Sequence, residues 1–181
     1  MRFDTLIKKM EKFNSNPQQN TNTRDLSIRE VLCKIHNDID EATQQDVDKI
    51  MKQAAYMAKI NLEGGHRIKR ALTYLITQIA LQKRIKIPMM DIVATLMSIM
   101  VHSGGAHRVE SAIKTALDSI LRRHGAIVED IILRVISEFK SQKIFEGKDK
   151  RVADVIHKWH DETLKNVRNA GISQHTWTMA I

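Results

Sequence analysis

Four residues have the types and spacing of metal ligands. Cys33 and His36 form a Cys-x-x-His pair, and His157 and His160 form a His-x-x-His pair on one expected helix. Zinc normally needs four such ligands at defined separations, whereas these two pairs lie far apart in the sequence and include a single thiol. We interpret Cys33 as a buried cysteine beside a surface His36, and the second pair as the polar flank of an amphipathic helix. We expect no metal site and no cofactor.

The sequence also gives no sign of catalysis. A serine or cysteine nucleophile needs a base beside it, and none of the eight histidines belongs to a recognisable nucleophile motif. The glycine pairs at 64–65 and 104–105 fit no phosphate-binding loop, and we interpret them as helix ends. Asp91 and Asp130 fall in the first turns of expected helices, where a carboxylate complements the helix dipole. We expect that the protein is not an enzyme, and a helical enzyme built on scattered histidines is the weaker alternative.

The basic residues give the clearest functional pattern. Residues 61–124 carry ten Lys and Arg against four Asp and Glu, an excess of +6 in a chain whose net charge is +8. Such groups bind phosphates with strong salt dependence and little sequence preference. RNA is therefore the predicted partner. The predicted RNA-contacting residues are Arg67, Lys69, Arg70, Lys83, Arg84, Lys86, Arg108, Lys114, Arg122 and Arg123.

A structural interpretation of the same charges stays open. Lys and Arg near helix C-termini stabilise the dipole, and the pairs Glu110–Lys114 and Asp118–Arg122 have the spacing of ion pairs within a helix. The aromatic content of 4% is too low for base-stacking platforms, so RNA would be recognised by shape and backbone, with duplex RNA the natural candidate. The alternative function is that of a helical interaction or scaffold protein whose basic surface faces an acidic partner.

The basic residues lie on two segments that look like copies of each other. One begins Gly-Gly-His-Arg-Ile at residue 64, and the other begins Gly-Gly-Ala-His-Arg-Val at residue 104. Arg67 and Arg108 hold matching positions. Each copy is expected to form a helical hairpin, with helices over 67–85 and 89–101 in the first, and over 108–124 and 127–139 in the second. Because one hairpin cannot bury its own apolar stripe, the copies should pack together or against flanking helices.

Every long apolar pattern in the chain has helical spacing, and no segment shows sustained period-two alternation. The predicted fold class is therefore all-α, a helical bundle of about eight helices. Ser27 and Glu30 have the pattern of a capping box that begins the second helix, and Gly125 is expected to end the sixth. The expected helices cover about 4–13, 28–39, 44–62, 67–85, 88–102, 107–124, 127–140 and 151–169.

Composition divides the chain into three parts. Residues 14–23 contain no apolar residue, which indicates a linker, so residues 1–24 are interpreted as a helix and polar linker that form an oligomerisation arm. Residues 25–103 form an N-terminal helical half, and residues 104–181 form a C-terminal half with an apolar tail. The arm and the tail are two means of forming a homo-oligomer.

Several features predict a cytoplasmic protein without a membrane partner. The single cysteine fits a reducing compartment. No signal peptide is expected, because charged and apolar residues alternate after Met1. The most apolar stretch, residues 87–101, is too short to span a bilayer and is interpreted as a buried helix.

The chain resembles the small RNA-silencing suppressors of closteroviruses. The resemblance covers about residues 25–170 and rests on chain length, two helical halves with internal symmetry, the basic segments at 64–67 and 104–108, and the absence of a catalytic motif. It implies a compact all-helical viral protein whose subunits form a ring with a basic, RNA-binding inner surface. It further implies sequestration of small duplex RNA in the cytoplasm of an infected plant cell. Arg67, Arg70, Arg108 and Arg122 are contacts chosen from this sequence alone.

Overall fold

The computed structural model describes residues 2–16, 23–60, 66–83, 85–103 and 106–141, with five single residues further on. This part of the chain contains seven α-helices, one short 3₁₀-helix and no strand, so the predicted all-α class is confirmed. The expected eighth helix lies mostly outside the described residues, although the five single residues are helical and exposed: Asp154, Lys158, Asp161, Glu162 and Lys165. The elements are α1 (Arg2–Ser15), α2 (Thr23–Asp38), η2 (Ile39–Glu41), α3 (Gln44–Ala58), α4 (His66–Ala80), α5 (Met89–Val101), α6 (His107–His124) and α7 (Ala126–Ser141).

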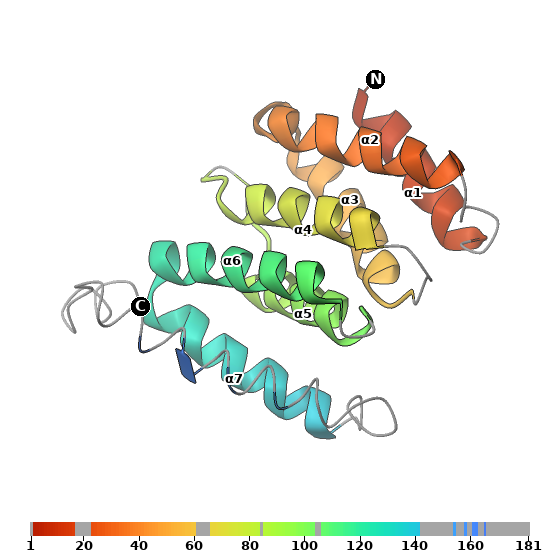
Figure 1. Cartoon of the computed structure of the whole chain (residues 1–181). Coiled ribbons are helices and arrows are strands. Elements are labelled where there is room, and N and C mark those ends of the chain that lie inside the picture. Colours follow the sequence, from red (N-terminus) through yellow and green to blue (C-terminus); the bar gives the residue numbers. More distant parts are fainter. Residues whose placement is uncertain are drawn as a thin grey trace.

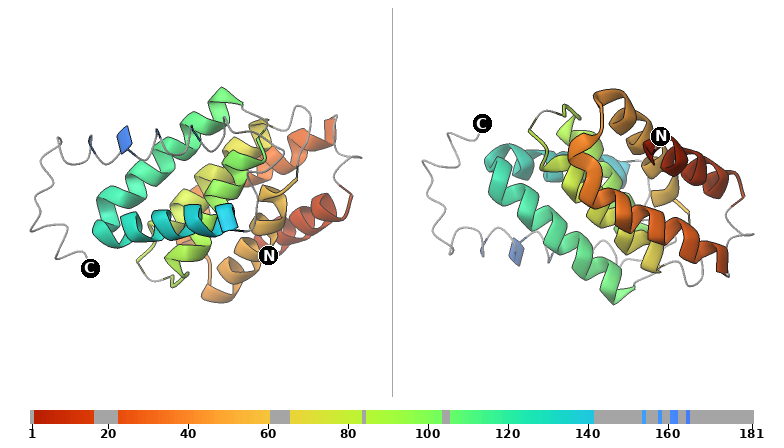
Figure 2. Two further views of the ribbon diagram at one scale, coloured as in Figure 1. Left: turned by 90° about the horizontal axis from the view of Figure 1, so that it is seen from below. Right: turned by 90° about the horizontal axis from the view of Figure 1, so that it is seen from above.

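The helices are stacked in two layers (Figures 1 and 2). The even layer consists of α2, α4 and α6, in which α4 packs between the other two helices. The odd layer consists of α1, α3, α5 and α7, each packed on the next in that order. Successive helices along the chain run in opposite directions, so the helices within each layer run parallel.

Two contacts between segments far apart in sequence show this parallel arrangement. The side-chain amide of Gln44, at the start of α3, bonds both to the N–H (2.7 Å) and to the carbonyl (2.8 Å) of Lys86, just before α5. At the same end of the molecule, His124 Nε2 at the end of α6 donates to the carbonyl of Ala80 at the end of α4 (3.3 Å). The starts of α3 and α5 therefore lie together, as do the ends of α4 and α6.

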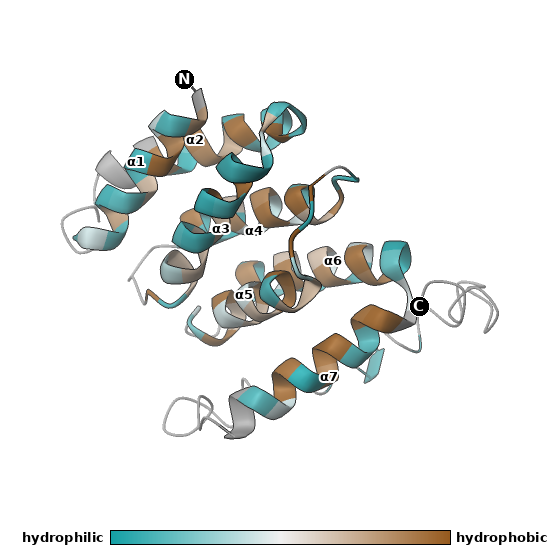
Figure 3. Cartoon of the chain, turned by 180° about the vertical axis from the view of Figure 1, so that it is seen from behind, coloured by the Kyte–Doolittle hydropathy of each residue, from teal (hydrophilic) through white to brown (hydrophobic). Residues whose placement is uncertain are grey.

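The hydrophobic core lies between the two layers. Most helices have one apolar side and one polar side (Figure 3), because their apolar residues recur every three or four positions. In α4 the fully buried residues include Leu72, Leu75 and Ile76. Each such side chain contributes about 1.5–3 kcal/mol when it leaves water. One continuous cluster runs from Phe3 to Ile136 and crosses the predicted boundary at residues 103 and 104.

The two segments with similar sequences lie against each other. Helix α4 packs on α6, and α5 packs on α7, so corresponding helices of the two hairpins are neighbours in the same layer. This packing agrees with the expectation that the hairpins bury their apolar stripes together. Their origin as an internal duplication stays a prediction.

Helix α1 packs on helices of its own chain, and its expected role as an oligomerisation arm stays a prediction. All its described apolar residues are at most 8% exposed, and the helix contacts α2 and α3. The side-chain amide of Asn14 also donates to the backbone carbonyl of Gln53 in α3 (3.1 Å). The apolar side of α1 is therefore covered within its own chain.

The helix starts show one wrong prediction and one capping box that was missed. Helix α2 begins at Thr23, four residues before Ser27, so Ser27 lies inside the helix and does not cap it. No proline or glycine follows Pro17 in that stretch, and nothing there stops the helix from extending. The capping box belongs to α3 instead, where the Thr43 hydroxyl accepts from the Asp46 N–H and the Asp46 carboxylate accepts from the Thr43 N–H, both at 3.1 Å.

Two helix ends decide where basic residues lie. Helix α4 ends at Ala80, so the expected extension of this helix to residue 85 is wrong. Lys83 and Lys86 lie in the connection to α5, where the Gln44 amide bonds to the backbone of Lys86, and Arg84 lies outside the described residues. Gly125 ends α6 as predicted, with φ 71° and ψ −145°. The glycine pairs at 64–65 and 104–105 lie outside the described residues.

Replacing Gly125 with alanine should destabilise the protein by about 1–3 kcal/mol, because its positive φ and extended ψ are sterically open only to glycine. Chemical denaturation monitored by circular dichroism measures this loss. The matched control is Ser111→Ala on the exposed side of α6, for which we expect a change of at most about 0.5 kcal/mol. Equal stability of the Gly125→Ala protein and the wild type would contradict the prediction.

Candidate nucleic-acid interface

The two layers differ in charge. By sequence, the three helices of the even layer carry ten Lys and Arg against five Asp and Glu, whereas the four helices of the odd layer carry eight of each. The whole difference comes from α4 and α6, since α2 is balanced. Helix α4 contains no Asp or Glu at all. The outward side of α4 and α6 is therefore the most basic surface of the described helices.

Arg67 and Arg108 lie at the same end of the even layer, which we call the arginine end. Each is the second residue of its helix, and both are exposed. Because α4 and α6 are parallel neighbours, matched positions on them are separated by about one interhelical distance, roughly 8–10 Å. The structure thus brings together two arginines that are 41 positions apart in the sequence.

Arg70 lies one turn after Arg67 on the same side of α4 and is half-buried. Lys114 is also half-buried, but it lies about 120° around α6 from Arg108, at the edge of the exposed side. The Nε atom of Arg70 is covered and has no hydrogen-bond partner among the described residues. Such an unpaired donor is uncommon in a folded protein. Lys114 forms no ion pair with Glu110 within the described part of the chain, although the spacing of the two residues allowed for one.

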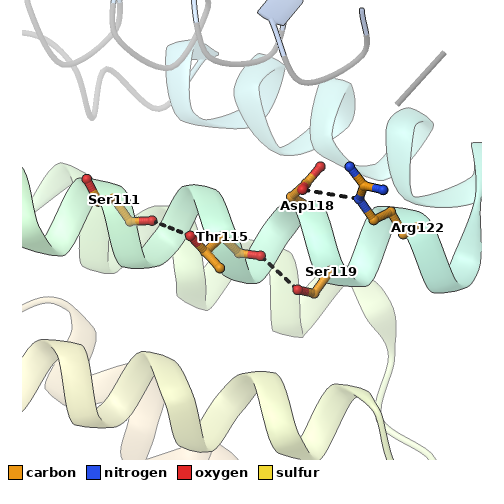
Figure 4. A network of polar contacts seen from close by, with 5 residues as sticks. All are labelled: Ser111, Thr115, Asp118, Ser119 and Arg122. Atoms are coloured by element: carbon orange, nitrogen blue, oxygen red, sulfur yellow. Dashed lines mark hydrogen bonds and ion pairs between the residues drawn. The ribbon is translucent and has the colours of Figure 1, made fainter. Parts of the chain in front are cut away.

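Four of the other predicted contacts lie at the opposite end of α4 and α6. Arg122 and Arg123 are exposed in the last turn of α6, and Lys83 and Lys86 are exposed in the connection after α4. The Nε atom of Arg122 lies 3.2 Å from Asp118 (Figure 4), as the spacing predicted. Exposed pairs of this kind contribute about 1 kcal/mol or less, and the aspartate offsets part of the arginine's charge. About 21 Å of helix separates Arg108 from Arg122.

Lys69 does not belong to this surface. Its residue is only 5% exposed, and its ammonium donates to the carbonyl of Ala58 (3.1 Å) and to that of His102 (3.0 Å). An RNA phosphate cannot reach an ammonium held inside the protein, so the prediction of Lys69 as an RNA contact is wrong. The sequence could not show that Lys69 is buried. Its partners are backbone carbonyls, which every residue has, so no residue type marks them.

The bonds of Lys69 connect three helices at the arginine end. Ala58 is the last residue of α3, and His102 directly follows α5. Cations are favourable at helix C-termini, where carbonyl groups lack intrahelical partners. Glu110 holds the matching position in α6 and is also buried, at 6% exposed. The two similar segments therefore differ in the sign of their buried charge.

A groove of about 500 Å³ lies on the odd layer, away from the basic surface. Residues of α3, α5 and α7 line it, together with Ile87 and Pro88. Its charged residues are of both signs: Asp48, Lys52, Lys59, Asp91 and Glu138. A polyanion would meet three carboxylates there, so the groove does not suit RNA.

The Cys-x-x-His pair on α2, Cys33 and His36, is not arranged as a metal site. Cys33 is exposed and His36 is half-buried, the reverse of what the sequence suggested. The His36 ring bonds to the Cys33 carbonyl through Nδ1, so it satisfies its own helix. Within the described ranges, no three His, Cys, Asp or Glu residues gather in a way that could hold a metal ion. His157 and His160 lie outside those ranges.

Comparisons with known proteins add no family. No family model matches the chain, and neither curated proteins nor solved structures give a significant match. None of the described helices combines the length and the hydropathy needed to cross a bilayer. The basic face of α4 and α6 also exposes Tyr74, in the middle of α4, which the sequence patterns did not single out.

Replacing Lys69 with methionine keeps the aliphatic stem and removes the ammonium, which leaves the carbonyls of Ala58 and His102 without this donor. We expect the free energy of unfolding to fall by about 2–3 kcal/mol, the range for hydrogen bonds to a charged group. Urea denaturation measures it. The matched control, Lys49→Met on the exposed side of α3, should change stability by at most about 0.5 kcal/mol. A Lys69→Met protein as stable as this control would contradict the structural role.

Proposed function

We propose that the protein binds RNA through the phosphate backbone, using the outward side of α4 and α6. The observation that carries this proposal is the difference in charge between the layers, with the exposed Arg67 and Arg108 on adjacent parallel helices. A basic face on one side of an otherwise balanced fold is the electrostatic footprint of a polyanion-binding protein.

The proposed contacts are backbone-directed for a physical reason. Arginine and lysine bind phosphate oxygens whatever the base, so affinity depends on salt and hardly on sequence. Contacts at the two ends of α6, about 21 Å apart, would allow one RNA molecule to lie along the helices. Lys69 no longer belongs to the proposed contacts, and Arg84 stays among them on the sequence alone. The described residues of the set are Arg67, Arg70, Lys83, Lys86, Arg108, Lys114, Arg122 and Arg123.

The biological role that we propose follows the resemblance to closterovirus silencing suppressors. An oligomer with its even layers facing inward would sequester small RNA in the host cytoplasm. Only the polar side of α1 remains exposed for such an oligomer, because its apolar side is covered by its own chain. Helix α7 exposes two apolar residues, Ile127 at 41% and Leu133 at 47%, which lie about 120° apart around the helix.

The same basic face allows a second candidate function, that of an interaction or scaffold protein. In this case the basic face of α4 and α6 would bind an acidic protein partner. RNA binding and self-association, measured separately, distinguish the two candidates.

Reversing both charges at the arginine end, Arg67→Glu with Arg108→Glu, should abolish RNA binding while leaving helicity unchanged. Single alanine replacements of either residue should each lower the slope of log affinity against log salt by about 0.7–0.9, the value expected for one lost phosphate contact. Fluorescence anisotropy with short RNA and DNA, duplex and single-stranded, across a salt series measures both effects.

The matched control is Lys49→Glu with Lys52→Glu, which makes the same change in net charge on the odd layer. This protein should retain most of the affinity. An equal loss in both double mutants would mean that net charge alone drives binding. Wild-type protein that binds no nucleic acid at low salt would refute the proposed function.

A further inference from the structure

Tyr74 is an exposed aromatic residue in the middle of the basic face. It is 45% exposed and lies one turn after Arg70 and two turns after Arg67, so the three residues share one side of α4. Four large apolar or aromatic side chains are exposed among the described residues, and only Tyr74 belongs to the even layer. The others are Tyr56 on α3, and Ile127 and Leu133 on α7.

The surroundings of Tyr74 are polar. The matching position on the neighbouring helix α6 is Thr115, which is exposed and lies one turn after the exposed Ser111. The Thr115 hydroxyl donates to the Ser111 carbonyl (3.0 Å), and Ser119 donates to the Thr115 carbonyl in the same way (3.0 Å; Figure 4). These hydroxyl hydrogens are therefore used within the helix.

Tyrosine and arginine are also enriched in protein interfaces, so binding of an acidic peptide is one outcome of the test below. The isolated ring of Tyr74 stands among basic and hydroxyl side chains. It suits a nucleic acid, where aromatic side chains stack on bases and basic side chains follow the phosphates. Stacking requires a free base face. Within a duplex each base is already stacked on both sides, and a side chain reaches only unpaired bases or ends.

We propose that Tyr74 stacks on an unpaired base of the bound RNA, so that the protein prefers RNA with single-stranded nucleotides to a blunt duplex. This inference rests on the proposed function and narrows its ligand. Arg67 and Arg70 would hold the phosphates beside the stacked base. Every base has a stacking face, so the contact adds affinity without adding sequence preference.

The test compares Tyr74→Ala, Tyr74→Phe and the control Tyr56→Ala, which removes a ring of similar exposure (54%) from the odd layer. Each protein is titrated by fluorescence anisotropy with an unstructured single-stranded RNA and with a blunt duplex of equal length, after circular dichroism has confirmed the fold. Tyr74→Ala should lose at least about fivefold in affinity for the single strand, the lower limit for one stacked base. Its affinity for the duplex should change less than about twofold, whereas Tyr74→Phe and Tyr56→Ala should bind both RNAs like the wild type.

Each other outcome overturns a distinct statement. Wild-type binding that is unchanged in Tyr74→Ala, or weakened equally for both RNAs, overturns the stacking contact and leaves the proposed function standing. A loss in Tyr74→Phe equal to that in Tyr74→Ala assigns the effect to the hydroxyl and also overturns it. Wild-type protein that binds neither RNA overturns the proposed function, and with it the stacking contact. Binding of an acidic peptide in place of RNA would support the second candidate function.

Discussion

The geometry of the basic face depends on the hydrogen bonds of Lys69. Its ammonium is buried between the ends of α3 and α5. Each of these helices ends just before the connection to the next even-layer helix, α4 or α6. By bonding to Ala58 and His102, Lys69 holds both helix ends beside α4. The starts of α4 and α6, with Arg67 and Arg108, are thereby kept at one end of the molecule. A residue expected at the surface thus acts from inside the protein.

The stacking of the helices explains why a modest excess of positive charge is concentrated on one side of the molecule. Helices that follow one another along the chain lie in opposite layers. The basic helices α4 and α6 are therefore neighbours, and the balanced or acidic helices between and after them lie in the other layer. The even layer collects the basic residues of α4 and α6, and the odd layer stays balanced. Since the apolar stripes of both layers meet in the core, the polar sides are left outward, where long arginine side chains remain solvated.

Patterns within a helix were predictable, and contacts between distant residues were not. The apolar spacing and Gly125 placed α6 at its observed bounds and α5 and α7 within one residue, because these signals are local. The connection after α4 is held by bonds between Gln44 and Lys86, which are 42 positions apart, so no local signal placed Lys83 and Lys86 there. The exposure of Arg67 and Arg108 followed from their helix positions. The burial of Lys69 depends on backbone carbonyls, which leave no signature in a sequence.

The parallel packing within each layer also determines the electric field at the arginine end. The N-termini of α4 and α6 meet there, and each carries the positive end of a helix dipole, equivalent to about half a unit charge. The C-termini of α3 and α5 meet at the same end and carry the opposite sign. Lys69 donates to carbonyls at both of these ends, so its positive charge offsets their negative field inside the protein. An approaching anion would then encounter the dipoles of α4 and α6 in addition to the arginine charges, and its encounter rate would rise as ionic strength falls.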